Sequence, residues 1–94
     1  MEPINFKIGI VEYDLSLIVK EWITSEYREE ALNILRVCID NIDPEITSDL
    51  IEFVIYYEKK MGNIICAHLD FIKARLIKKG LMDKGGVFGM PFTN

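Results

Sequence analysis

The sequence predicts a mainly α-helical protein, a compact bundle of three to four helices with a short strand at each end of the chain. Three observations support this fold class. The chain has 94 residues, enough for one modest hydrophobic core. Half of the residues are hydrophobic, which is more than a disordered chain contains. Through the middle of the chain, apolar residues recur every three or four positions, which is the period of a helix with a buried face. We therefore expect a single domain over residues 1–94.

The first predicted element is a strand over residues 4–10. In INFKIGI, isoleucine and phenylalanine alternate with polar or small residues, and a period of two places one side of a strand in the core. Asp14 is the predicted cap of a helix over 14–24, because its carboxylate can accept hydrogen bonds from the free N–H groups of the first turn. Ser25 is the predicted cap of a second helix, over 25–42.

The third predicted helix covers residues 44–61 and has the clearest start signal in the chain. Asp43 is the expected cap, and Pro44 takes the first helical position, where its missing N–H does no harm. The apolar stripe that begins in this helix continues without interruption into the next segment of the chain.

The sequence KKMGN interrupts this long helical pattern. We expect two helices that meet at Gly62, the second covering 63–79 with Asn63 as its cap and Gly80 after its end. One continuous helix is the alternative. Residues 64–76 are apolar on most sides, and such a helix belongs at the centre of a bundle or in a subunit interface.

The C-terminal segment 86–92 reads either as a second strand or as an exposed apolar tail. Its large residues Phe88, Met90 and Phe92 alternate with glycine and proline. We hypothesise that this segment pairs with the strand over 4–10, within one chain or swapped between two copies, because each would otherwise leave backbone groups unpaired.

Charge is divided unevenly along the chain. Residues 1–57 contain twelve acidic and four basic side chains, whereas residues 58–94 contain seven basic and three acidic ones. The overall charge of −4 argues against a protein that coats nucleic acid. We expect the acidic and basic halves to pair between copies or with a partner. No uncharged stretch is long enough for a membrane span, and no secretion signal is visible, so we expect a cytoplasmic protein that does not enter a membrane.

Few residues in the sequence suggest catalysis or metal binding. Cys38 and Cys66 lie in apolar helical patterns, which favours two buried thiols over a disulfide or a zinc site. The only histidine, His68, is flanked by Cys66 and Asp70, but helical residues two apart point away from each other. We therefore expect His68 to be packed with one hydrogen bond. No phosphate loop or hydrolase motif occurs, so we predict no enzymatic activity, no cofactor and no metal.

The preferred functional hypothesis is a small protein–protein interaction module: a regulator, an inhibitor or an assembly subunit. The chain is rich in apolar residues for its length, and a homodimer is the simplest way to bury a surplus apolar face. The residues predicted to form an apolar contact are Phe53, Tyr56, Tyr57, Ile64, Phe71, Phe88 and Phe92. Those predicted to form an acidic contact are Glu26, Glu30, Asp49 and Glu52.

Nucleic-acid binding is the alternative hypothesis. The segment HLDFIKARLIKKGLM, followed by apolar residues, resembles the end of a winged helix-turn-helix domain, in which a recognition helix closes on a Gly-Leu pair before a β wing. The resemblance implies phosphate contacts from the basic residues Lys73, Arg75, Lys78, Lys79 and Lys84. This segment departs from the family in its apolar helix and in the short sequence that follows Gly80.

Overall fold

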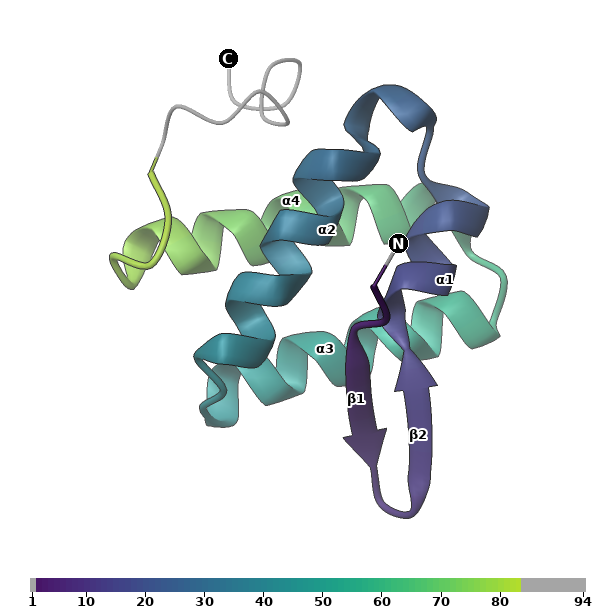
Figure 1. The fold of residues 1–94 in the computed structure, drawn as a ribbon, viewed down its shortest axis with the longest axis horizontal. Coiled ribbons are helices and arrows are strands. Elements are labelled where there is room, and N and C mark those ends of the chain that lie inside the picture. The colour runs from purple at the N-terminus through teal and green to yellow at the C-terminus, as the bar shows by residue number, and fades with distance from the viewer. Residues whose placement is uncertain (1, 84–94) are drawn as a thin grey trace.

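The protein is a helical domain with one N-terminal β-hairpin, and the prediction of a mainly α-helical bundle is confirmed (Figure 1). A computed structural model describes residues 2–83. The elements in chain order are β1 Asn5–Ile8, β2 Val11–Asp14, α1 Leu15–Trp22, α2 Ser25–Asp40, α3 Pro44–Glu58 and α4 Gly62–Lys78. Among these described residues, no helix combines the length and the apolar character that crossing a bilayer requires.

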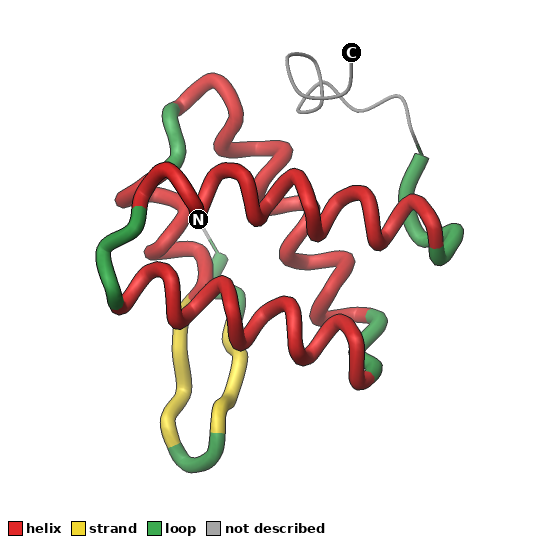
Figure 2. Tube along the Cα trace, turned by 180° about the vertical axis from the view of Figure 1, so that it is seen from behind, coloured by secondary structure: helices red, strands yellow, loops and turns green. Residues whose placement is uncertain are grey.

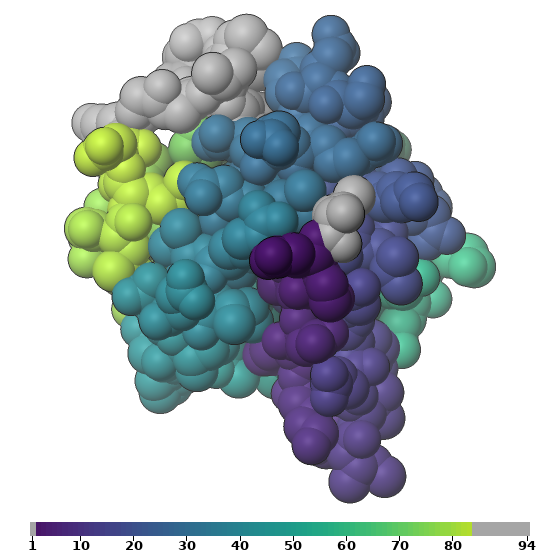
Figure 3. Space-filling model, viewed as in Figure 1, coloured from purple at the N-terminus to yellow at the C-terminus, as the bar shows by residue number. Residues whose placement is uncertain are grey.

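The N-terminal strand is shorter than predicted, because the chain turns back inside the predicted strand. β1 pairs antiparallel with β2, and Phe6 lies opposite Tyr13. Gly9 has a φ of 62°, which suits the first central residue of a two-residue hairpin turn. Ile10 therefore lies at the tip, where it is 96% exposed instead of buried. Figure 3 shows the hairpin extending past the helical body.

Asp14 joins the hairpin to α1 and caps this helix, as predicted. Its carboxylate accepts hydrogen bonds from the backbone N–H and the hydroxyl of Ser16, at 3.0 and 2.6 Å, and from the backbone N–H of Ile4 at 3.0 Å. Burial raises the pKa of Asp14, but these hydrogen bonds outweigh burial and leave the pKa below its usual value. One carboxylate thus fixes the start of the sheet and the start of the first helix.

α2 starts at the predicted residue and ends two residues before the predicted one. Thr24, not Ser25, occupies the cap position, and its side chain makes no capping hydrogen bond. The corner between α1 and α2 is closed instead by Arg28, whose guanidinium donates to the backbone oxygens of Ile23 and Lys20 at 3.0 and 3.3 Å.

The start of α3 is the predicted one, since Asp43 accepts a hydrogen bond from the backbone N–H of Ile46 at 2.8 Å. α3 and α4 are separate helices, as expected, but Gly62 is not the end of α3. Lys60 takes that role with a φ of 57°, and the backbone N–H of Met61 reaches the oxygen of Tyr56, which together form a Schellman ending. Asn63 likewise lies inside α4 and is not its cap.

Gly62 is the first residue of α4, where it packs directly against Trp22. A Cβ atom on Gly62 would lie 2.6 Å from Cζ3 of the Trp22 ring, closer than carbon atoms approach. Glycine is thus needed here for the close approach of α1 to α4, and not for a turn.

The core lies between α4 and the other three helices, all of which α4 contacts. The inner face of α4 consists of Ile65, Leu69, Ile72 and Leu76, which are fully buried. This confirms that α4 is central to the bundle. Gly80, with a φ of 77°, follows its end as predicted, and the N–H of Leu81 reaches the oxygen of Leu76.

The predicted C-terminal strand, 86–92, with Phe88 and Phe92, lies outside the described residues. Within residues 2–83 the strand that pairs with β1 is β2, which was not predicted. The backbone groups on one side of β1 therefore find their partner nearby in the sequence.

Candidate interaction surface on the α3–α4 hairpin

The candidate interaction surface is the outer face of the hairpin formed by α3 and α4. The two helices run side by side on the face seen in Figure 2. Each has a row of exposed residues at alternating spacings of three and four. In α3 and its C-cap residue this row is Glu45, Ser48, Glu52, Ile55 and Lys59. In α4 it is Ile64, Ala67, Phe71, Ala74 and Lys78, which we call the outer stripe of α4.

Ion pairs join the start of α3 to the end of α4. Arg75 contacts Asp49 at 2.7 Å and Glu45 at 2.9 Å, and Lys79 contacts Asp43 at 2.8 Å and Glu45 at 2.6 Å. The acids lie at a helix N-terminus and the bases at a helix C-terminus, where each suits the helix dipole. The antiparallel hairpin brings these oppositely charged helix ends together.

These pairs shift the pKa values of their members in the direction that favours the charged forms. The backbone N–H of Ile46 and then Lys79 lower the pKa of Asp43, and Lys79 lowers the pKa of Glu45. The carboxylate of Asp49 raises the pKa of Arg75, and Asp43 raises that of Lys79. Acidic residues of α3 and basic residues of α4 thus pair within one chain here. The expected pairing of the acidic and basic halves between copies or with a partner stays a prediction.

His68 lies between the two helices and is almost completely buried. Its Nε2 atom lies 2.8 Å from the backbone oxygen of Asp49, and because a carbonyl only accepts, Nε2 carries the proton. Its Nδ1 atom is 3.8 Å from a carboxylate oxygen of Glu52. The ring meets Tyr56 edge-on and stacks on Phe71, with centroids 5.3 and 5.5 Å apart. The prediction of a packed histidine with one hydrogen bond is confirmed.

Phe71 is the largest apolar side chain exposed on this face. It is 49% exposed, and its ring is held between His68 and Arg75, whose guanidinium carbon lies 5.2 Å from the ring centre. Ile64, two turns earlier on α4, is 39% exposed. Two of the predicted apolar contact residues therefore lie together on the outer stripe of α4.

The other predicted apolar contact residues do not share this surface. Phe53 is fully buried in the core of its own chain, which corrects its assignment to an exposed contact. Tyr56 is partly covered by His68. Tyr57 faces α1 instead, and there burial and a hydrogen bond with Glu21 raise its pKa. Leu17, Lys20, Glu21 and Tyr57 line a cleft of about 420 Å³ at that place.

The predicted acidic contact residues are also dispersed. Glu26 is exposed at the start of α2, and Glu52 is exposed beside His68. Asp49 is 3% exposed and is bound by Arg75. Glu30 pairs with a lysine of α4. These four acids therefore differ in exposure and in the partners that they contact.

Most of the basic residues predicted to contact nucleic acid are already paired within the chain. Lys73 is 2% exposed, and its Nζ atom lies 3.0 Å from Glu30, although the two groups are not aligned as a hydrogen bond. Arg75 and Lys79 face the carboxylates of α3. Lys78 is exposed, and Lys84 lies outside the described residues. The described part of this set does not form a continuous basic surface.

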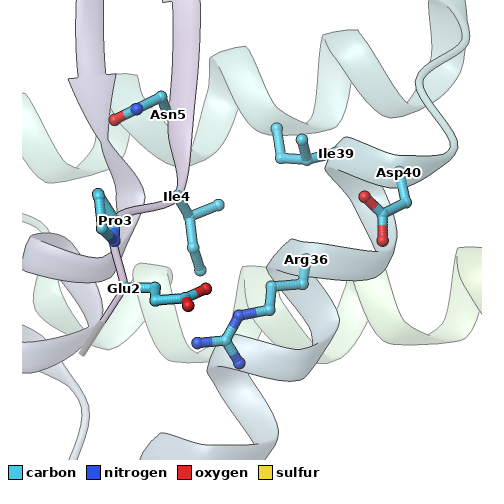
Figure 4. A pocket seen from close by; sticks show the side chains of 7 residues that line it. All are labelled: Glu2, Pro3, Ile4, Asn5, Arg36, Ile39 and Asp40. Atoms are coloured by element: carbon cyan, nitrogen blue, oxygen red, sulfur yellow. The ribbon is translucent and has the colours of Figure 1, made fainter.

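Two further clefts each combine charged and apolar side chains. Figure 4 shows one of about 200 Å³ between the N-terminal segment and α2, in which Ile4 and Ile39 lie among charged groups of Glu2, Arg36 and Asp40. A second cleft, of about 490 Å³, is lined by Asn41, Ile42, Asp43, Lys79 and Leu81. Both combine charges of opposite sign with isoleucine or leucine side chains.

The two thiols are held in their protonated forms. Burial raises the pKa of Cys38 to about 12, and burial also raises the pKa of Cys66. In residues 2–83, no group of three or more histidine, cysteine or acidic side chains is arranged to hold a metal ion.

Comparison of the chain with protein-family models, with curated proteins and with solved structures gave no match. Its function must therefore be inferred from its own residues. Sequence reasoning missed Ala67 and Ala74 as surface residues, although their spacing from Phe71 in the sequence already placed them on one side of a helix.

Proposed function

We propose that this chain is a small, non-enzymatic, cytoplasmic protein–protein interaction module, a regulator, inhibitor or assembly subunit, that binds through the outer stripe of α4. The observation that supports this most strongly is the position of Phe71. It is half exposed on a helix whose opposite face fills the core, and exposed apolar residues flank it on the same side.

Covering this stripe would release water from a continuous apolar surface. Burial of apolar area contributes roughly 25 cal/mol per Å², and an aromatic side chain at the centre of a patch is a frequent binding hot spot. Phe71 is also held in place by His68 and Arg75, so little side-chain freedom remains to be lost when a partner binds.

Nucleic-acid binding remains the alternative, and the ion pairs make it the weaker one. A phosphate contact from Arg75 or Lys79 would have to compete with the carboxylates of Asp43, Glu45 and Asp49. Lys78 is the one residue of the predicted basic set that is described, exposed and outside these pairs.

The proposal is tested by co-expression of two differently tagged copies and by capture from the source cells. Wild-type protein should recover a stoichiometric second chain, either its own other copy or another protein. Phe71→Glu should recover at least tenfold less, because it places a charge at the centre of the apolar stripe. Leu17→Glu is the matched control, since Leu17 is 58% exposed but lies on α1. Equal recovery by the two variants, or none by wild type, would reject the proposal.

The alternative is tested by titration of a DNA duplex at low salt. If it is correct, Lys78→Ala together with Lys79→Ala weakens binding and reduces its dependence on salt. We expect no measurable duplex binding by the wild-type protein.

A further inference from the structure

We propose that the partner of the outer stripe of α4 is the same stripe on a second copy, with the two helices antiparallel and related by a two-fold axis between Phe71 and Ala74. This inference rests on the proposed function, because it names the partner of the surface proposed there.

The spacing of the outer stripe of α4 suits packing against another helix. Ile64, Ala67, Phe71, Ala74 and Lys78 follow one another at intervals of three, four, three and four residues, and all are exposed. Their mean interval of three and a half residues is the spacing by which one helix packs along another. The inner face of α4 already binds the rest of the chain, so this seam is available to a helix from outside.

Large and small side chains alternate around Phe71. Phe71 is the large residue of the stripe, and Ala67 and Ala74 lie on either side of it. In an antiparallel pair with the axis between positions 71 and 74, each Phe71 lies over Ala74 of the second copy. The large Phe71 side chain of each copy then packs against the small Ala74 of the other, so the same contact forms twice.

Charged residues beside the apolar part of the stripe favour the antiparallel orientation. In the described part of the chain, Lys78 has no ion-pair partner, and Glu52 meets no lysine or arginine. The same antiparallel pairing places Lys78 over Ala67 of the second copy. Ala67 directly precedes His68, which lies 3.8 Å from Glu52, so Lys78 can reach that carboxylate across the interface.

The charge of Lys78 opposes a parallel arrangement of the two helices. Parallel helices related by a two-fold axis place each residue beside its own copy. Lys78 would then face Lys78, and like charges in contact oppose association. Antiparallel pairing replaces this repulsion with two contacts between Lys78 and Glu52.

Sedimentation equilibrium over a range of concentrations tests the pairing. Wild-type protein should show a reversible equilibrium between one and two chains. Phe71→Glu should raise the dissociation constant at least thirtyfold, as expected for the loss of a central hot spot. Leu17→Glu should leave it unchanged. Circular dichroism checks that each variant is still folded.

Charge exchange tests the contact between Lys78 and Glu52. Lys78→Glu and Glu52→Lys should each raise the dissociation constant about twofold to fivefold, and the double variant should restore it. No restoration by the double variant would overturn this contact as the basis of the orientation.

Oxidative cross-linking tests the orientation directly, in a Cys66→Ser background. Ala74→Cys, next to the two-fold axis, should form a disulfide between copies. Ala67→Cys should not, because position 67 of one copy lies far from position 67 of the other, on the opposite side of the axis. Efficient cross-linking of Ala67→Cys would show parallel helices and overturn the inference.

A wild-type protein that sediments as one chain at all concentrations would also overturn self-pairing. The proposed function would survive that result if Phe71 were still required for the capture of another protein. Failure of both experiments would reject both proposals.

Discussion

The two faces of α4 both carry apolar residues but lie in different environments. The inner face, Ile65, Leu69, Ile72 and Leu76, is fully buried against three other helices. The outer stripe also carries isoleucine and phenylalanine, at 39% and 49% exposure. Periodicity thus identifies both apolar faces but not which of them the chain itself covers. In a chain of 94 residues, the other helices suffice to cover one face of α4.

The largest expected effect comes from opening a cavity on the inner face. Leu69→Ala should lower the free energy of unfolding by about 2–5 kcal/mol, because a fully buried leucine leaves a cavity when truncated. Leu17→Ala, at an exposed position, should change it by less than about 0.5 kcal/mol. Urea unfolding monitored by circular dichroism measures both. Equal effects would mean that the inner face is not the core.

A smaller effect is expected where α4 begins. Gly62→Ala should lower the free energy of unfolding by about 1–3 kcal/mol, because its Cβ would press on the Trp22 ring. In a Trp22→Leu background the same substitution should be neutral or stabilising, since alanine favours a helix more than glycine does. A cost of Gly62→Ala that is unchanged without Trp22 would contradict this packing.

The ion pairs of Asp43 and Glu45 with Lys79 predict that the stability of the fold depends on pH. The folded pKa values of Asp43 and Glu45 are lowered from 3.8 and 4.5, so their contribution to stability is present above those values and is lost as the pH falls through the folded pKa. Lys79→Met should therefore be less stable than wild type near about pH 6, and the difference should shrink in acid. Because the pKa of Lys79 is raised, Lys79 loses its charge, and with it its contribution to stability, only at strongly alkaline pH.

Thermal unfolding from acid to neutral pH measures this difference, with Lys59→Met as the control. Lys59 is exposed and, among the described residues, forms no ion pair. A difference between Lys79→Met and wild type that stays constant from neutral to strongly acidic pH would show that these ion pairs do not stabilise the fold.

The smallest expected effect is a gain in stability at the end of α3. Lys60→Gly should raise the free energy of unfolding by up to about 1 kcal/mol, because glycine adopts a positive φ without the steric cost that a side chain brings. Lys59→Gly is the matched control. Lys59 has a φ of −86°, so glycine there should be neutral or destabilising. A gain from both variants would contradict the assignment of Lys60 to the left-handed position.

Features set by neighbouring residues could be predicted from the sequence. The caps at Asp14 and Asp43 depend on backbone groups two or three residues away, and both were found as expected. The apolar residues of both faces of α4 also recur at helical spacing, although spacing does not show which face the chain buries. The hairpin turn could not be found in this way, because Ile8 and Ile10 continue the period of two through Gly9.

Features that depend on distant residues were not predicted. The reason for Gly62 is the ring of Trp22, which lies in another helix. The pairing of Arg75 with Asp49 depends on the antiparallel placement of α3 and α4, so acidic and basic segments that looked free in the sequence neutralise each other. The burial of Phe53 and the exposure of Phe71 depend on which helix faces the remaining elements cover.

The central claim is that the outer stripe of α4 is a binding surface for a second copy of the chain. The most direct test is the mass in solution of wild type and of Phe71→Glu, measured by sedimentation equilibrium over the same concentrations. We expect two chains for wild type at high concentration and one chain for the folded variant. A single chain for both, or two chains for both, would contradict the claim.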